Sequence, residues 1–95
     1  MRYLISYDVN TTTPVGQKRL RHVARACEDH GVRVQNSVFE CVMDYAHLLT
    51  FRERLRTIID EESDSIRIYP LGKDSSRIIH MGTQKAFDVT APLIL

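Results

Sequence analysis

The sequence predicts an α+β fold in which two helices cover one face of an antiparallel sheet. Segments rich in β-favouring residues alternate along the chain with two stretches whose apolar residues recur with a helical period. The chain has 95 residues, close to the common size of one domain. One sheet and two helices therefore have to share a single core, and residues 1–95 are expected to form one domain.

A strand and a helix are predicted in the first third of the chain. Residues 2–9 are rich in tyrosine, leucine, isoleucine and valine, which strands favour. A loop over 10–14 follows, and Thr12 or Thr13 is expected to cap the next helix. That helix is predicted over 14–30 because apolar residues recur at i, i+3, i+4 and i+7. These residues are Leu20, Val23, Ala24 and Cys27.

The middle of the chain, residues 32–42, is predicted to be a strand with apolar residues on both faces. One face carries Val32, Val34, Val38 and Val42, and the other carries Phe39, Cys41 and Met43. Gly31, directly before this strand, is expected to end the helix in the left-handed conformation that suits glycine. The helices of so short a chain can cover only one sheet face. The second face is therefore expected to contact another copy, which gives a face-to-face homodimer.

The second half of the chain repeats this alternation of helix and strand. A helix is predicted over 45–60, where apolar residues again form a stripe, and a strand with alternating residues over 65–71. A hairpin turn at 72–76 and a fourth strand at 77–81 follow. Residues 83–95 form an apolar tail, which is expected to add a strand to the sheet edge of the dimer partner.

The order of the elements depends on the long middle strand. If this strand bends or splits at Asn36 or Ser37, the order is β-α-β-β-α-β. If it is one piece, the order is β-α-β-α-β-β. The economical solution is a ferredoxin-like fold, a four-stranded antiparallel sheet with two helices on one face.

The composition excludes several classes of protein. No apolar run approaches the ~20 residues needed to cross a membrane, and the first residues lack the pattern of a signal peptide. The protein is therefore expected in the cytoplasm. Cys27 and Cys41 lack a Cys-x-x-Cys pattern and are expected to be buried thiols. The four histidines have no zinc-ligand spacing.

The net charge of +1 conceals an uneven distribution of charge. Residues 60–64 contain four acids and no base, whereas 18–25 contain four bases and no acid. The candidate nucleic-acid-binding residues are Lys18, Arg19, Arg21, Arg25 and Arg33. The alternative is an ordinary solvated helix surface, and phosphate contact is favoured only beside a site that cleaves phosphodiester bonds.

Asp8 is the strongest candidate for chemistry. It ends an apolar strand, although aspartate is depleted in strands. One interpretation is a turn residue that begins the following loop. The other is a ligand for a hard metal ion. Magnesium prefers carboxylate oxygens and keeps several waters, so one carboxylate per subunit suffices if two copies converge.

Two segments of the sequence are distinctive. They are Tyr7-Asp8-Val9, which is followed by the basic helix, and Gly31-Val-Arg-Val-Gln-Asn-Ser-Val-Phe-Glu40. Both resemble segments of the small CRISPR-associated nuclease family, the second core Cas protein. The resemblance covers roughly residues 1–82 in element order and length and implies the ferredoxin-like fold. It also implies an endonuclease that cleaves RNA or DNA with magnesium, or manganese, through Asp8 of both subunits. Tyr7, Ser37 and Phe39 would shape the site.

The resemblance also implies partners. These are a second copy of the chain, the CRISPR integrase, and double-stranded DNA or single-stranded RNA, within the process of spacer acquisition. The alternative is a non-catalytic scaffold of the same fold that binds DNA and bridges integrase dimers. A third interpretation, a ligand-binding regulatory module, would need a glycine-rich loop, which the sequence lacks.

Overall fold

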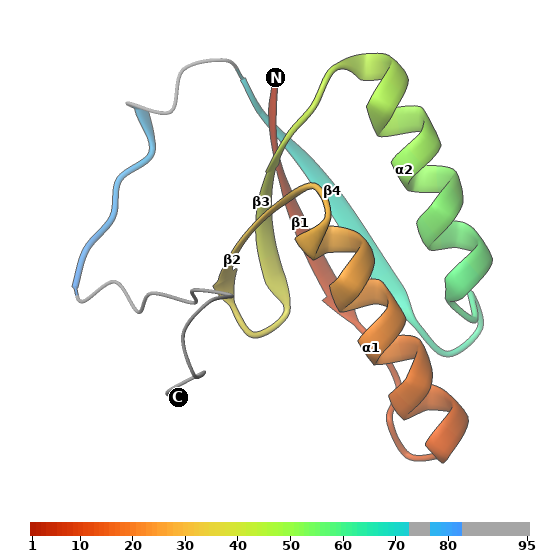
Figure 1. Ribbon diagram of the computed structural model, residues 1–95. Helices are drawn as coiled ribbons and strands as arrows, with labels where there is room; N and C mark the ends of the chain where they lie inside the picture. The colour runs from red at the N-terminus through yellow and green to blue at the C-terminus, as the bar shows by residue number, and fades with distance from the viewer. Residues whose placement is uncertain (73–76, 83–95) are drawn as a thin grey trace.

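The computed structural model describes residues 1–72 and 77–82, and these form a two-layer α+β domain (Figure 1). Its elements are β1 (Arg2–Asp8), α1 (Pro14–Glu28), β2 (Gly31–Gln35), β3 (Val38–Val42), α2 (Tyr45–Ile58) and β4 (Ser65–Gly72). The predicted long strand is two strands, because Asn36 and Ser37 form a turn. The order β-α-β-β-α-β is therefore the correct alternative, and the predicted ferredoxin-like fold is confirmed.

The four strands form one antiparallel sheet in the order β2-β3-β1-β4. Ile5 lies at its centre, opposite Phe39 on one side and Ile68 on the other. Both helices lie over one face of this sheet (Figure 1). The core fills the space between the two layers and includes Tyr3, Ile5 and Tyr7 from β1, all of them buried.

The other sheet face is not covered by any described helix, and we call it the open face. Adjacent strand residues point to opposite faces, so Arg2, Leu4, Ser6 and Asp8 of β1 belong to it. Val32 and Val42 also lie there and are 64% and 61% exposed. The predicted apolar residues on a second face are confirmed by these two valines.

The ends of α1 follow from local hydrogen bonding. Thr13 is the N-cap, as predicted, and its hydroxyl oxygen accepts a bond of 3.1 Å from the backbone N–H of Gly16. The prediction for Gly31 is wrong, since in the described chain only Gly72 and Gly82 have positive φ. Gly31 instead begins β2, where a Cβ would lie 2.6 Å from the Cys41 sulfur. Glycine is needed there for close contact with β3.

The second half of the chain differs from prediction in two places. Helix α2 ends at Ile58, two residues before the predicted end at residue 60. The backbone N–H of Asp60 bonds to the Asp64 carboxylate instead of continuing the helix. The predicted strand 77–81 is wrong, because residues 77–82 pair with no strand of the described part of the chain (Figure 1). Of the predicted turn at 72–76 only Gly72 is described, and the tail 83–95 lies outside the described residues.

Cys27 and Cys41 are free, buried thiols, as predicted. Burial raises the pKa of Cys27 to about 12, with a further contribution from Cys41, and burial raises the pKa of Cys41 to about 11. Both thiols are therefore protonated at neutral pH. Neither helix in the described part of the chain is long and apolar enough to cross a membrane.

Candidate functional site

Asp8 is the last residue of β1 and is exposed on the open face. Its neighbour in the sheet is Ser65, the first residue of β4. The preceding residue, Tyr7, is buried among the helices, so the side chains of Tyr7 and Asp8 point to opposite faces. The carboxylate of Asp8 therefore stands at the end of a rigid strand, on the side that another molecule can approach.

The loop after Asp8 is held by a buried carboxylate, that of Asp64. One oxygen of Asp64 accepts a bond of 2.9 Å from the backbone N–H of Asn10. The other accepts bonds from the backbone N–H of Asp60, at 2.9 Å, and from Arg19 Nε, at 2.8 Å. Because Asp64 directly precedes Ser65, these bonds fix both chain segments beside Asp8.

The Asp64 side chain is completely buried, whereas that of Arg19 is 18% exposed. Burial by itself would raise the pKa of Asp64. The bonds from Arg19 and from the backbone N–H groups of Asp60 and Asn10 outweigh it and hold this pKa below the usual value. Asp64 was not predicted to have this role, because in the sequence it is only one member of the acidic run 60–64.

The residues predicted to shape the site lie mainly beneath it. Tyr7 and Phe39 are buried in the core, with ring centroids 6.1 Å apart, on the sheet face opposite the Asp8 side chain. The backbone N–H of Tyr7 donates a hydrogen bond of 3.1 Å to the backbone carbonyl of Ser37. The Tyr7 hydroxyl donates one of 3.2 Å to the backbone carbonyl of Asn36. These groups therefore fix the strand end that carries Asp8 without contacting its carboxylate.

The predicted basic residues of α1 fall into two groups. Lys18, Arg21 and Arg25 are exposed and form no ion pair within residues 1–72 and 77–82. Arg19 instead bonds to Asp64, which gives it a structural role. Sequence periodicity predicted that these residues avoid the core, but it could not show that Arg19 has a distant partner.

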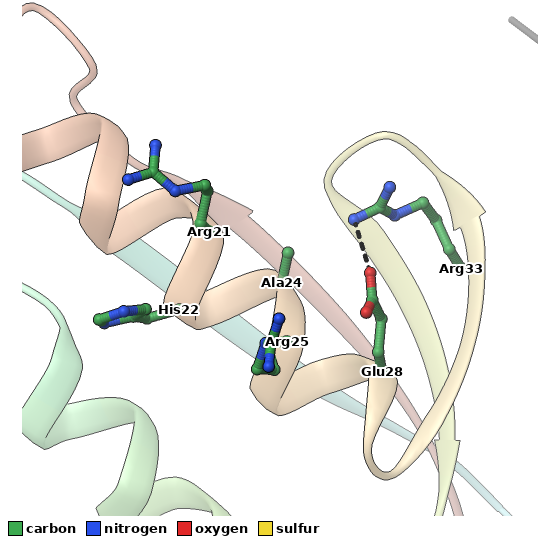
Figure 2. Close-up of a pocket in the computed structure, with 6 residues that line it drawn as sticks. All are labelled: Arg21, His22, Ala24, Arg25, Glu28 and Arg33. Carbon is green, nitrogen blue, oxygen red and sulfur yellow. Dashed lines mark hydrogen bonds and ion pairs between the residues drawn. The ribbon is translucent and has the colours of Figure 1, made fainter. Parts of the chain in front are cut away.

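Arg33 lies on the helix side of β2, with its guanidinium 5.0 Å from the centre of the Phe39 ring. With Arg21 and Arg25 it lines an open cavity of about 490 Å³ between α1 and β2 (Figure 2). His22, Ala24 and Glu28 complete the lining. The structure thus brings together three of the five predicted nucleic-acid-binding residues, at a place separated by the sheet from the Asp8 side chain.

One chain alone does not supply a full set of metal ligands. Within the described residues, no three His, Cys, Asp or Glu side chains are grouped so that they could hold a metal ion. Magnesium, however, is commonly held by one or two carboxylates together with waters and substrate phosphates. An exposed Asp8 on a face that a second copy can reach fits a shared site of this kind.

The fold and its charged groups define a class, the small ferredoxin-like proteins with exposed arginines on the first helix and a carboxylate at a strand end. The chain belongs to the family of CRISPR-associated protein Cas2, whose family model matches residues 1–79. It is 48% identical over 95 residues to the CRISPR-associated endonuclease Cas2 of Halalkalibacterium halodurans, with 99% of each chain covered. It is 50% identical over 93 residues to the endoribonuclease Cas2 3 of Rhodospirillum rubrum, covering 97% of this chain and 98% of the relative.

A solved structure shows the same fold. Cas2 of Streptococcus pyogenes, crystallised at pH 6.5, has a TM-score of 0.77 and 55% identity, covering 86% of this chain and 100% of the other. The family predicted from the sequence is confirmed. The predicted enzyme class, a nuclease, is the class named for both curated relatives.

Proposed function

We propose that this protein is a metal-dependent endonuclease that cleaves RNA or DNA with Asp8 of two subunits. The observation that carries the proposal is the exposed Asp8 carboxylate at the end of β1, on the open face of the sheet. Membership of a family whose relatives are named endonucleases and endoribonucleases supports it.

The open face supports pairing of two copies. Val32 and Val42 stand exposed there, as does Tyr69 at 42%. Covering such residues is favourable by roughly 25 cal/mol for each Å² of apolar surface removed from water. In a symmetric pair the same surface serves both copies, so each subunit would contribute one Asp8 to a common site. The tail 83–95 would extend this interface by adding a strand to the partner.

The two Asp8 carboxylates would hold the metal ion, magnesium or manganese. When bound, this ion would stabilise charge on the phosphate and activate water. The protein's own contribution is position. Asp64 and Arg19 hold the backbone beside Asp8, and the arginines of α1 would hold the phosphate backbone of the nucleic acid.

Family membership also supports a biological setting for this activity. The protein would act in the cytoplasm during spacer acquisition, together with the CRISPR integrase. Its nucleic-acid partner would be double-stranded DNA or single-stranded RNA.

One observation favours a second function, a non-catalytic scaffold that binds DNA and bridges integrase dimers. Arg21 and Arg25 lie in the helix layer, whereas Asp8 lies on the open face. A duplex bound by these arginines therefore lies on the opposite side of the sheet from Asp8 of the same subunit. In this case the Asp8 pair would have no catalytic role.

The substitution Asp8→Asn separates the two functions. It keeps the side-chain size but removes the charge that holds a hard cation, so we expect cleavage of RNA or DNA to fall by ~100-fold or more. Binding of the nucleic acid should remain. Gel-based cleavage assays with and without magnesium measure this, and chelation of the wild-type protein should produce the same loss.

Asp29→Asn is the matched control, since Asp29 is also exposed and pairs with Arg54 away from the site. Equal cleavage by Asp8→Asn and the wild type would contradict the nuclease proposal. A folded wild type that binds duplex DNA but cleaves nothing with magnesium or manganese would establish the scaffold instead.

A further inference from the structure

The cavity between α1 and β2 has a lining that the proposed chemistry at Asp8 does not use. We infer that it is a phosphate-binding site with a built-in competitor, in which Glu28 occupies Arg33 until a backbone phosphate of the nucleic acid displaces it. This inference rests on the nucleic-acid-binding part of the proposed function. It adds a discrete site and a residue that sets its affinity.

The geometry of α1 creates the site. Arg21, Arg25 and Glu28 lie one helical turn apart in sequence, so they follow one side of the helix. Ala24 lies between them, and its small side chain leaves the space open (Figure 2). Arg33 faces them from β2, where the Phe39 ring supports its guanidinium. Three guanidinium groups and one carboxylate thus surround the same cavity.

The ion pair between Glu28 and Arg33 is loose. Its N–O distance is 3.4 Å, against 2.8 Å for Arg19 and Asp64. Charge-assisted bonds of this type are usually ~2.7–2.9 Å long. The Glu28 side chain is 44% exposed, and Arg33 Nε is buried without a hydrogen-bond partner within the described residues. Solvent reaches the Glu28 carboxylate and weakens its pair with the mostly buried Arg33, so a better ligand can replace the carboxylate.

A phosphate is the ligand that this lining fits. The planar guanidinium presents parallel N–H groups that match the oxygens of a phosphate, and it remains charged at all accessible pH values. Arg21 and Arg25 form no ion pair within residues 1–72 and 77–82. In the cavity lining, the Glu28 carboxylate is therefore the one negative group, against three arginines. Inorganic phosphate presents the same oxygens as a backbone phosphate of a nucleic acid. The experiment therefore has to distinguish binding of free phosphate from binding of a nucleic acid.

The first test compares Glu28→Gln with Glu53→Gln. Both substitutions remove one negative charge, but Glu53 lies on α2 and is paired with Arg56 rather than with the cavity. Binding of a labelled DNA duplex and a labelled single-stranded RNA is measured with a chelator present, so that no cleavage occurs. We expect Glu28→Gln to raise affinity about threefold or more beyond Glu53→Gln at low salt. For Glu28→Gln, the slope of the logarithm of affinity against the logarithm of salt concentration should become steeper by up to ~0.9. The reason is that Arg33 then releases a counterion on binding.

The second test fills the cavity without changing charge. Ala24→Leu places a larger side chain between Arg21 and Arg25. Because Ala24 is only partly buried, we expect the variant to fold. An unchanged melting temperature verifies this. We expect this variant to bind the oligonucleotides severalfold more weakly. Combined with Glu28→Gln, it should abolish the gain in affinity.

Inorganic phosphate provides the remaining comparison, through the NMR signal of the Arg33 side chain. We expect both phosphate and the oligonucleotides to move this signal, and chloride at equal ionic strength to leave it in place. A response to phosphate alone, or equal affinities for Glu28→Gln and Glu53→Gln, would overturn the inference while leaving the Asp8 proposal intact. A wild type that binds no oligonucleotide would overturn the inference and the binding part of the proposed function, whatever its cleavage assay shows.

Discussion

At the residue scale, two aspartates of this chain have opposite environments. Asp8 is exposed at a strand end, whereas Asp64 is fully buried and accepts three hydrogen bonds. Both lie beside the same pair of strands, β1 and β4. A buried carboxylate with a charged partner fixes the backbone, and an exposed one is available for a ligand.

We predict that Asp64→Asn destabilises the protein by about 2 kcal/mol at pH 7, because Arg19 loses its charged partner and a buried acceptor is weakened. The pKa of Asp64 is lowered in the folded state, so its contribution is complete above the unfolded value of about 3.9. That contribution is lost as the pH falls toward the folded pKa. Urea unfolding of wild type and variant should therefore give stabilities that converge below about pH 4.

Asp29→Asn serves as the comparison, because its pair with Arg54 is exposed and should contribute less than about 1 kcal/mol. A constant difference between wild type and Asp64→Asn from pH 7 to pH 2 would contradict this assignment.

Sequence patterns predict that Asp8 lies at the end of an apolar strand and that the basic residues of α1 face away from the core. The partnership of Arg19 with Asp64 could not be predicted. It joins residues 45 positions apart, and no local pattern encodes such a contact. The cavity of Arg21, Arg25 and Arg33 likewise depends on how β2 packs beside α1.

At the element scale, the pairing of β2 with β3 explains both a success and an error of prediction. One of the two predicted alternatives has the long strand bend at Asn36 or Ser37, and these two residues form the turn of a hairpin. The sequence predicts that Gly31 ends the helix, since glycine is common there. Its true constraint is tertiary, because the opposite strand leaves no room for a side chain.

We predict that Gly31→Ala lowers the free energy of unfolding by about 1–3 kcal/mol, as overpacking in a core does. The added Cβ would overlap the backbone carbonyl of Glu40 and approach the Cys41 sulfur. Urea denaturation measures the change. Val32→Ala, at the next position and 64% exposed, is the control and should change stability by less than half as much. Equal losses for the two variants would show that the close approach of the strands is not the constraint on Gly31.

The predicted strand at 77–81 failed for a different reason. Its isoleucines favour a strand, and Ile79 remains 85% exposed. A strand requires a neighbour that accepts and donates backbone hydrogen bonds, and a propensity alone does not supply one.

At the scale of the whole molecule, one face of the sheet is covered by the two helices and the other is open (Figure 1). The covered face contains the core and gives the chain its stability. The open face carries Asp8 together with exposed valines, so the surface proposed for pairing is also the surface proposed for catalysis. The central claim is that the site contains one carboxylate from each of two copies.

Mixed dimers test this claim most directly. Wild type and Asp8→Asn are combined in varying proportions, unfolded and refolded together, and magnesium-dependent cleavage is measured per total protein. If both carboxylates are required, activity follows the square of the wild-type fraction, so an equal mixture retains about a quarter of the activity. Retention of about half, with a linear dependence on the wild-type fraction, would show that each subunit acts alone and would contradict the account.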